Sequence, residues 1–479
     1  MHHTAVIPVE RLLARLAKPM ASAIWVSGRN ITEAEENSVF ADWPELRDLV
    51  RLHVDEVQRS VRYSITLDAR TVPRLIAWYR GLHPDFTADW EREAARLLAQ
   101  GSITRTAQCV GDQGCIIMPM DGSGLKFTPV EVNTTLPNAS TQDWPMGDRL
   151  SDVPTRLDLA RVQDAVDAAF ANPASCTAAF LVLHHGHIVG ERYASGIGPH
   201  TQLESWSMGK SLTATLLGIL LHKGWLNLED QAPVPAWQQS GDPRGAIRLI
   251  DLLRMSSGLC FTRDEPRHTW EHGVADHFMV YAEAIDVFDF SINRPLEYPP
   301  NTVGRYRNCD PLTLGYIIKR TVTEQLGEDY LTWPQRALFD RLGIRRQVLE
   351  TDLYGNFILT GYDYGTARNW ARLGLLYAQD GVWLGERLLP EGYTKVVSTP
   401  APAWQEPEYG GQFWVNGTGK YAMPTDAYYM AGFGEQRVCI IPSHDLVVVR
   451  LGHRRGLEPG KADLNTALHK LIAAVEACQ

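Results

Sequence analysis

The sequence contains little that points to a membrane, to nucleic acid or to a disulfide-rich fold. No apolar run reaches the roughly 18 residues that a membrane-spanning helix needs. The net charge is −10 and no run of Lys or Arg occurs, so the basic surface that binds nucleic acid or an anionic membrane is missing. The 479 residues include seven cysteines, a small and odd number that excludes a dense disulfide framework. We therefore expect a small or medium-sized neutral molecule as the partner.

Signals for a metal, a cofactor or export are also missing. The cysteines are expected to be mainly buried thiols, and only Cys109 and Cys115 are close enough in sequence for a local pair. No two Cys-x-x-Cys motifs suggest zinc, and nothing in the sequence requires a metal or an organic cofactor. The first residues have neither the apolar core nor the cleavage site of an export signal. We expect a soluble protein of the bacterial cytoplasm or periplasm, with the compartment and a removed signal left open.

The composition is that of a globular chain with material for two domains, at 44% hydrophobic and 21% charged residues. A segment rich in turn formers at 136–155 predicts the boundary. Residues 1–150 form an N-terminal extension in which helices are expected at 71–79 and 90–100 and strands at 104–110 and 115–120. No motif there carries chemistry, which predicts a packing, lid or oligomerisation element and leaves a homo-oligomer possible.

Residues 151–479 are expected to form an α+β catalytic domain. Helices are predicted at 157–170 and 462–477, a β-hairpin at 178–193, and strands at 437–442 and 446–451. The chain between the two groups of strands is mainly helical, at 250–255, 311–321, 331–342 and 366–380. An antiparallel sheet flanked by N- and C-terminal helices, with a helical subdomain inserted at about 206–375, fits this order.

Ser207-Met-Gly-Lys210 comes directly before a long apolar helix predicted over residues 212–221. Residues three apart on a helix lie on one face, with β-carbons about 5 to 6 Å apart, so the Lys210 amine can reach the Ser207 hydroxyl. The free backbone N–H groups of the first helical turn can stabilise a developing oxyanion. The pattern predicts a serine nucleophile with its own lysine base.

The Ser-x-x-Lys pattern alone is not specific, since a chain of this length contains about two by chance. The second occurrence, Ser123-Gly-Leu-Lys126, lies in a glycine-rich turn that no helix follows, and we interpret it as chance. The alternative for Ser207 is a helix N-cap serine followed by a surface lysine. Three neighbouring histidines at 184, 185 and 187 are interpreted as hairpin-turn residues, because alternate strand residues point to opposite faces.

Two further patterns follow in chain order. Tyr306-Arg-Asn308 lies between a proline-rich turn and a predicted helix, which suits a side chain presented from a loop, whereas Tyr354-Gly-Asn356 has no such context. The third is the segment 430–434, Met-Ala-Gly-Phe-Gly, which precedes a strand and contains Gly432 and Phe433. Its small residues would let a substrate approach the strand backbone. The alternatives are a core tyrosine with a satisfied hydroxyl and a glycine that marks only a bulge.

This ordered set resembles the penicillin-binding-protein and serine β-lactamase superfamily, and is most similar to its class C-like esterases and 6-aminohexanoate-dimer hydrolases. Segments 252–259 and 374–390 support the resemblance, which covers about residues 155–479. The absence of any Gly-x-Ser-x-Gly motif argues against an α/β-hydrolase fold. The resemblance implies an acyl-serine mechanism without a cofactor, and says little about the substrate.

The resemblance also implies a role for each site residue. Ser207 would attack an ester or amide carbonyl, and Lys210 would accept or relay the proton, for which it must be neutral part of the time. Tyr306 would protonate the leaving group, and Asn308 would orient the substrate or the lysine. Backbone N–H groups of Ser207 and Phe433 would form the oxyanion hole. Candidates to line the site are Trp206, Gly432 and Phe433 and, with less support, Trp270, Tyr362 and Tyr364.

One departure from the family pattern bears on the substrate. Family members that act on β-lactams or peptidoglycan usually carry Lys or His at the first position of the third motif, where this chain has Met430. A hydrolase of esters or linear amides is therefore the leading prediction. A β-lactamase or DD-peptidase-type enzyme is the alternative, and a catalytically silent binding protein on the same fold is the third.

Overall fold

The computed structural model describes residues 7–150 and 156–478, which divide into two compact units. Unit 1 consists of residues 1–129, 261–287 and 351–355, and unit 2 of residues 130–260, 288–350 and 356–479. The first crossing between units, at Pro129 and Val130, lies close to the turn-rich segment of the sequence. Unit 1 also includes two later segments, so each unit is assembled from pieces that are far apart in the chain.

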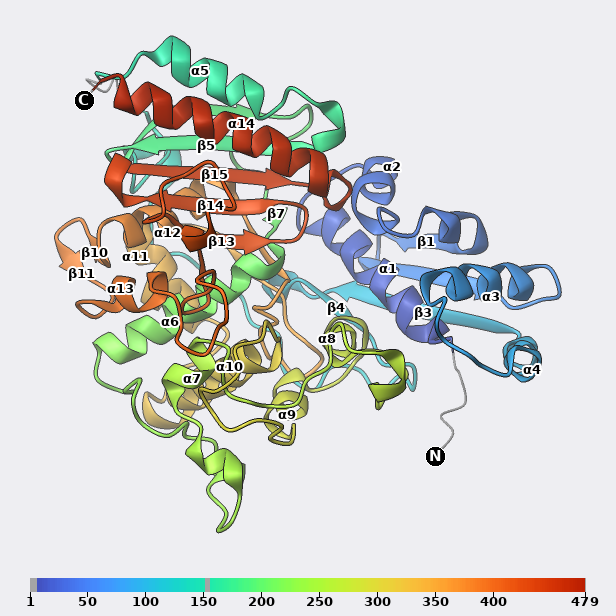
Figure 1. Cartoon of the computed structure of the whole chain (residues 1–479). Helices are drawn as coiled ribbons and strands as arrows, with labels where there is room; N and C mark the ends of the chain where they lie inside the picture. The colour runs from blue at the N-terminus through green and yellow to red at the C-terminus, as the bar shows by residue number, and fades with distance from the viewer. Residues whose placement is uncertain (1–6, 151–155, 479) are drawn as a thin grey trace. The chain divides into compact units, whose positions relative to one another are not determined.

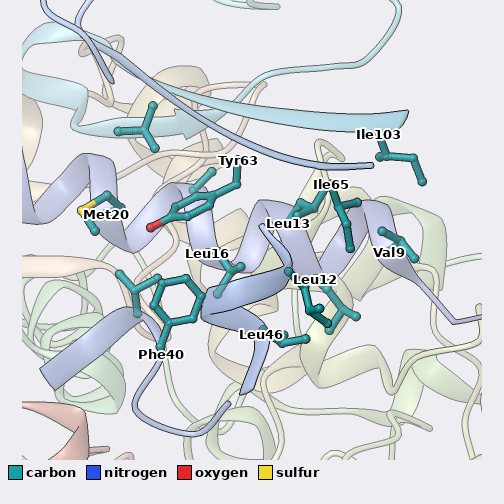
Figure 2. Close-up of a cluster of buried hydrophobic side chains, with 14 of the residues drawn as sticks. Val9, Leu12, Leu13, Leu16, Met20, Phe40, Leu46, Tyr63, Ile65 and Ile103 are labelled. Carbon is teal, nitrogen blue, oxygen red and sulfur yellow. The ribbon is translucent and has the colours of Figure 1, made fainter. Parts of the chain in front are cut away.

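Unit 1 is built around α1 (Val9–Trp25) and a four-stranded antiparallel sheet in the order β1-β2-β3-β4. Residues 12–23 of α1 are all buried. Figure 2 shows apolar side chains of α1 facing Tyr63 and Ile103 of the sheet and Phe40 from the following segment. The strands are β1 (Arg51–Asp55), β2 (Ser60–Thr66), β3 (Ser102–Cys109) and β4 (Cys115–Ile117). The remaining helices are α2 (Ile31–Ala34), α3 (Thr71–Leu82), α4 (Trp90–Gln100) and α8 (Asp276–Ala282).

The expected helices at 71–79 and 90–100 and the expected strands of the N-terminal region are all present. Cys109 lies directly opposite Cys115 in the β3–β4 pair, and both are buried. A buried Arg105 on β3 pairs with Glu283, which also binds Arg11 of α1. Because Glu283 belongs to the later segment 261–287, this ion pair joins distant parts of the chain within unit 1.

Unit 2 contains a six-stranded antiparallel sheet in the order β12-β13-β14-β15-β5-β6, which joins strands from both ends of the unit (Figure 1). The N-terminal hairpin is β5 (Thr177–His184) and β6 (His187–Tyr193), as the sequence predicts. The C-terminal strands are β12 (Trp414–Val415), β13 (Tyr428–Gly432), β14 (Gln436–Ile441) and β15 (Leu446–Gly452). Their alternation places Cys439 and Val448 on one face and Val438 and Val447 on the other.

Helices cover both faces of this sheet. The first and last helices of the unit, α5 (Leu159–Ala168) and α14 (Leu457–Glu476), pack on the face of Cys439 and Val448. On the other face, α12 (Ala367–Ala378) approaches so closely that a β-carbon on Gly374 would lie 2.6 Å from a methyl of Val447. The predicted α+β architecture, a sheet flanked by N- and C-terminal helices, is confirmed.

The insert between β6 and β12 is mainly helical, as expected. Its helices are α6 (Gly209–His222), α7 (Leu249–Leu253), α9 (Val287–Ile292), α10 (Cys309–Arg320), α11 (Asp340–Leu342), α12 and α13 (Tyr393–Ser398). The regular helix predicted at 331–342 is wrong in part, because a π-helical turn (Gln335–Phe339) precedes a single turn of α11. Two small sheets complete the insert, β7 (Leu203–Glu204) with β9 (Asp363–Gly365) and β8 (Val348–Leu349), and β10 (Val382–Trp383) with β11 (Glu386–Arg387).

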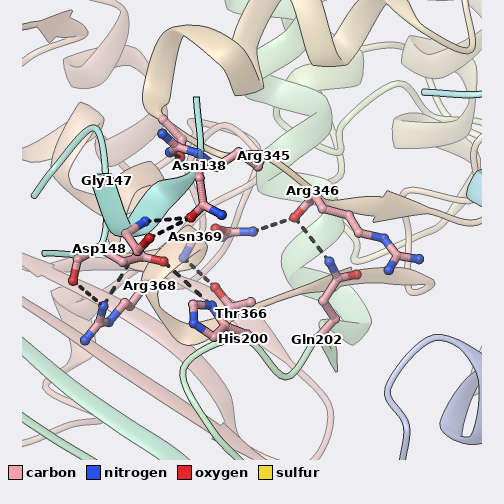
Figure 3. Close-up of polar contacts among 12 residues, drawn as sticks. Asn138, Gly147, Asp148, His200, Gln202, Arg345, Arg346, Thr366, Arg368 and Asn369 are labelled. Carbon is pink, nitrogen blue, oxygen red and sulfur yellow. Dashed lines mark hydrogen bonds and ion pairs between the residues drawn. The ribbon is translucent and has the colours of Figure 1, made fainter. Parts of the chain in front are cut away.

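A polar network fixes the chain just before β7 (Figure 3). The carbonyl of Arg346 accepts hydrogen bonds from Gln202 Nε2 at 3.3 Å and Asn369 Nδ2 at 2.8 Å. Thr366 caps α12 by accepting from the Asn369 N–H. These bonds link β7 to the start of α12, and β7 leads directly to the serine motif.

Within residues 7–150 and 156–478, no helix is long and apolar enough to cross a membrane. The three neighbouring histidines lie at the β5–β6 turn, where His184 opposes His187 and His185 has a φ of 48°. The part of the chain that the structure describes contains no group of three or more His, Cys, Asp or Glu side chains arranged to hold a metal ion.

Candidate active site

The chain that carries Ser207 is held by a short sheet and then turns sharply. β7 pairs with β9, and the Ser205 N–H donates to the Asp363 carbonyl at 2.7 Å. Trp206 follows with a φ of 47°, in the left-handed region that a bulky side chain rarely adopts. Its ring packs against Tyr362 at 5.8 Å and Phe433 at 6.2 Å between centroids. These contacts hold the strained turn from which α6 begins.

The structure places Lys210 against Ser207 as the spacing predicts. Lys210 Nζ donates to Ser207 Oγ at 3.0 Å and to the carbonyl of Thr360 at 2.9 Å. The lysine is 1% exposed, whereas Ser207 is partly exposed. A buried amine next to an accessible hydroxyl is the arrangement that a lysine base and a serine nucleophile require.

The residue at position 209, between Ser207 and Lys210, has to be a glycine. A β-carbon at this position would lie 2.5 Å from the carbonyl oxygen of Leu359. Such a contact with backbone is prohibitive, so any other residue would push the first turn of α6 away from segment 359–363. That segment supplies the Thr360 carbonyl to Lys210, and glycine therefore allows the lysine to be held.

Tyr306 lies beside Lys210. Its ring centroid is 4.8 Å from Lys210 Nζ, and its ring packs against Tyr409 at 5.8 Å and Trp414 at 5.4 Å. Tyr306 is half-buried in an irregular segment that ends where α10 begins at Cys309. Tyr306 thus lies in a loop before a helix, as the sequence pattern indicates.

Residues 252–259 hold this loop. The Arg305 N–H donates to the Met255 carbonyl at 3.1 Å, and Ser257 Oγ donates to Asp310 Oδ1 at 2.6 Å. Asp310 is 2% exposed, and burial raises the pKa of its carboxyl to about 6 against the hydrogen bonds that favour the ionised form. The family-like segment singled out from the sequence therefore supports the Tyr306 loop.

Asn308 is the least satisfied polar side chain of the site. It is fully buried at the start of α10, yet it makes no side-chain cap. Within the described residues, neither its Oδ1 nor its Nδ2 has a hydrogen-bond partner. Leaving such a buried amide unpaired costs about 1 to 3 kcal/mol, so a partner from solvent or substrate is expected here.

The third motif meets the nucleophile segment at Gly432, the last residue of β13. A β-carbon on Gly432 would lie 2.0 Å from the Ser205 carbonyl oxygen, which only glycine permits. Among the residues that the structure describes, the backbone N–H groups of Ser207 and Phe433 donate to no acceptor. Two unused donors next to a nucleophile are what an oxyanion hole requires.

Aromatic rings line this part of the site. Phe433 is 39% exposed and Trp206 is 6% exposed, and the guanidinium of Arg454 lies over both rings, at 4.3 Å and 5.1 Å from their centroids. Trp206 therefore has mainly a packing role, whereas the Phe433 ring is available to a ligand.

The motifs do not identify the groups supplied by segment 359–363. Asp363 is fully buried beneath the nucleophile turn, where Gln347 Nε2 donates to its Oδ1 at 2.7 Å. Burial raises the pKa of the Asp363 carboxyl to about 8, so the group is protonated near neutral pH. Asp363 and the Thr360 carbonyl belong to no recognisable motif, and only Tyr362 of this segment was a candidate.

The two sequence decoys lie outside the site. Ser123 is in an irregular segment of unit 1 that no helix follows. Tyr354 is 38% exposed and also belongs to unit 1. Ser207 is followed by a helix and Tyr306 lies in a loop before one, and neither Ser123 nor Tyr354 has such a context.

Comparison with known proteins identifies the family of the chain. A sequence model of the β-lactamase family matches residues 162–472. A 6-aminohexanoate-dimer hydrolase of Paenarthrobacter ureafaciens is 24% identical over 317 residues, which cover 60% of this chain and 77% of that protein.

Two solved structures share the fold. A candidate 6-aminohexanoate-dimer hydrolase from Bacillus anthracis has a TM-score of 0.53 at 20% identity, with 72% of this chain and 89% of that chain covered. A penicillin-binding protein homologue from Caulobacter crescentus has a TM-score of 0.50 at 16% identity, covering 68% and 100%. The family match spans well over half of the sequence, and the chain belongs to the β-lactamase family of hydrolases.

Proposed function

We propose that the protein is an acyl-serine hydrolase of esters or linear amides, with Ser207 as its nucleophile. The observation that carries the proposal is the 3.0 Å contact between Lys210 Nζ and Ser207 Oγ, made by a lysine that is almost fully buried. Burial disfavours the charged form of an amine, which is the condition for a lysine to act as a base.

In the acylation step, Ser207 Oγ forms a bond to the substrate carbonyl carbon while its proton passes to Lys210 Nζ. The carbonyl oxygen becomes an oxyanion that the N–H groups of Ser207 and Phe433 stabilise. The bond to the leaving alcohol or amine then breaks, and the leaving group takes a proton from Tyr306, which regains one from Lys210. The product is an ester of Ser207.

In the deacylation step, water attacks the acyl-enzyme carbonyl. Tyr306 takes a proton from the water as it passes its own proton to Lys210. The same relay then returns a proton to Ser207 Oγ as the bond from this oxygen to the acyl carbon breaks, which releases the carboxylic acid. The unpartnered amide of Asn308 provides a donor and an acceptor for the substrate or for this water. Ser207, Lys210 and Tyr306 thus regain their starting protonation states, with one proton of the water replacing the one that left with the alcohol or amine, and no cofactor takes part in these steps.

The substrate class follows from the third motif. Met430 occupies the position where relatives that act on β-lactams usually carry a cation, and it is 1% exposed. A buried thioether offers no charge to a substrate carboxylate at that place. The hydrolase of Paenarthrobacter ureafaciens is named for a linear amide dimer, which supports a linear amide or an ester as the substrate of this chain.

The test is hydrolysis of a short-chain p-nitrophenyl ester by the wild type and two serine variants. Ser207→Ala is expected to lower kcat at least about a thousandfold, because the acyl-enzyme can no longer form. Ser123→Ala is the matched control, since it removes the serine of the other Ser-x-x-Lys pattern, and it is expected to keep wild-type activity. Equal activity of wild type and Ser207→Ala would contradict the choice of nucleophile.

Covalent labelling separates this proposal from its alternatives. A fluorophosphonate should add once to the wild type, at Ser207, and not to Ser207→Ala, as read by intact mass and peptide mapping. A penicillin-interacting enzyme would also retain a fluorescent penicillin at Ser207. A silent binding protein would take neither label.

A further inference from the structure

Arg437 lies directly behind the third motif. It is on β14, opposite Ala431 of β13, and is 8% exposed. Its Nη1 donates to the carbonyl oxygens of Gly432 at 3.0 Å and Gln436 at 2.7 Å. Arg437 therefore binds both ends of the turn that joins β13 to β14, the turn that contains Phe433.

The guanidinium of Arg437 is itself fixed from its other side. Its Nε and Nη2 donate to the Tyr421 hydroxyl at 3.0 and 2.6 Å, and Nη2 also pairs with Glu435 at 3.0 Å. The Tyr421 hydroxyl donates in turn to Glu435. Burial opposes the charge on Arg437, but the attraction of Glu435 and Tyr421 outweighs it and raises the pKa of the guanidinium.

Arg437 and the nucleophile segment lie on opposite faces of the sheet. Arg437 shares its face with Tyr429, whose ring it contacts at 5.8 Å, two residues before Ala431 in β13. Gly432 is one residue further along, so the side on which its side chain would lie faces the other way. On that side lies Ser205, whose carbonyl would be 2.0 Å from a β-carbon on Gly432.

The peptide bond between Gly432 and Phe433 thus stands between Arg437 and the nucleophile segment. A trans peptide is planar, and its C=O and N–H point in opposite directions. Arg437 binds the Gly432 oxygen on one face of the sheet. The Phe433 N–H belongs to the same peptide plane and therefore points towards the other face of the sheet, where Ser205 leads to Ser207. This N–H donates to no acceptor within the described residues.

We propose that Arg437 is a positioning residue that holds the Gly432–Phe433 peptide plane so that its N–H points at the developing oxyanion. The inference rests on the proposed acyl-serine function. Arg437 touches no reacting atom and acts only through this plane. A second arginine, Arg450, binds the Gly434 and Glu435 carbonyls of the same turn and leaves the Gly432 carbonyl to Arg437.

The test compares an ester with its thionoester, in which sulfur replaces the carbonyl oxygen. Sulfur is a poor hydrogen-bond acceptor, so an oxyanion hole favours the oxygen substrate, and loss of one donor costs about 10² to 10³ in kcat. The ratio of the two kcat/KM values is independent of the fraction of enzyme that is folded. A purely structural defect therefore leaves the ratio unchanged.

Arg437→Met is expected to lower this ratio about tenfold or more, mainly through kcat on the oxygen ester. Arg437→Lys keeps a cation in the buried cluster, and should lower the ratio less. Arg105→Met is the matched control, because Arg105 is also a buried arginine but pairs with Glu283 in unit 1 and makes no bond to this turn. Its ratio is expected to equal that of the wild type.

An unchanged ratio in Arg437→Met, with Ser207 still labelled by the fluorophosphonate, would overturn the positioning role alone. If Arg437→Met does not fold because Glu435 is left unpaired, the double variant Glu435→Gln/Arg437→Met removes both charges, and an unchanged ratio in it leads to the same conclusion. Failure of the wild type to label at Ser207 would instead contradict the proposed function, and the role of Arg437 with it.

Discussion

At the residue scale, the protonation of Asp363 makes the stability of the folded protein depend on pH. Its carboxyl has a pKa of about 8 in the folded protein and an ordinary value near 3.8 in the unfolded chain. Between these two pH values the folded state binds one proton more than the unfolded chain. This group therefore makes the free energy of unfolding fall as pH rises, by at most about 1.4 kcal/mol per pH unit. The contribution is complete below about pH 4 and is lost by about pH 8.

Asp363→Asn is expected to remove this decline, because asparagine is neutral at every pH and keeps the acceptor for Gln347 Nε2. Urea unfolding at pH 5.0 and 8.5 should give the variant a smaller difference in free energy of unfolding than the wild type. Asp445→Asn, at a side chain that is 64% exposed, is the control and should leave the wild-type difference in place. A slope unchanged by Asp363→Asn would contradict a protonated carboxyl.

The same residues indicate how much of the site a sequence can reveal. The contact of Lys210 with Ser207 was predictable because residues three apart on a helix share a face, and Tyr306 was singled out by its place in a loop before a helix. The Thr360 carbonyl that binds Lys210 was not, since every residue has a carbonyl and only the folded backbone selects one. Arg437 was also missed as a candidate, because its role depends on a sheet face and not on a motif.

At the element scale, α6 carries Lys210 and also Gly218, where the lack of a side chain leaves room for residues packed against the helix. A β-carbon on Gly218 would lie 2.8 Å from Leu389 and 2.9 Å from the Tyr393 ring. The ring cannot easily move, because the Tyr393 hydroxyl donates to the Ala214 carbonyl at 2.7 Å. We expect Gly218→Ala to destabilise the protein by about 1 to 3 kcal/mol through overpacking, despite the better helix propensity of alanine.

Gly81 in the last turn of α3 is the matched control, since a β-carbon there has no atom within 4 Å. Gly81→Ala should stabilise α3 by about 0.5 to 1 kcal/mol, with the opposite sign to Gly218→Ala. Thermal unfolding of the two variants beside the wild type checks both signs. Stabilisation by Gly218→Ala would mean that Leu389 and Tyr393 make room.

Elements were predictable where their pattern was regular. The β5–β6 hairpin has apolar runs around a His-Gly turn, and α5 and α14 have one apolar stripe each. The α1 helix was not predicted, although its polar residues recur at helical spacing, at 11, 15, 18 and 22. The structure buries Arg15, Lys18 and Ser22 as well as the apolar residues, which a sequence pattern does not reveal. The 331–342 segment has helical periodicity, but Pro334 precedes a π-turn that the period does not reveal.

At the scale of the whole molecule, the two units cannot be separated by one cut in the chain. Segments 261–287 and 351–355 leave the middle of unit 2 to complete unit 1, a connection that composition alone could not reveal. Within unit 1, Val280 and Tyr281 of α8 are buried, and Glu283 neutralises the buried Arg105. Segment 261–287 packs against residues 1–129, with Phe278 against Trp43 and Trp270 against His83.

A chain that begins at Val130 would therefore contain the whole of unit 2 but would leave segment 261–287 without its neighbours. Apolar side chains that lose their packing become exposed, and the segment should open locally. Limited proteolysis is expected to cut the shortened chain within 261–287 at least about tenfold faster than the full chain, with the cut mapped by mass spectrometry. Glu283→Gln in the full chain, which removes the ion pairs to Arg105 and Arg11 but keeps the apolar contacts, should give an intermediate rate. Equal cutting of the shortened and full chains would mean that segment 261–287 folds without residues 1–129, and the N-terminal region would then be an independent module.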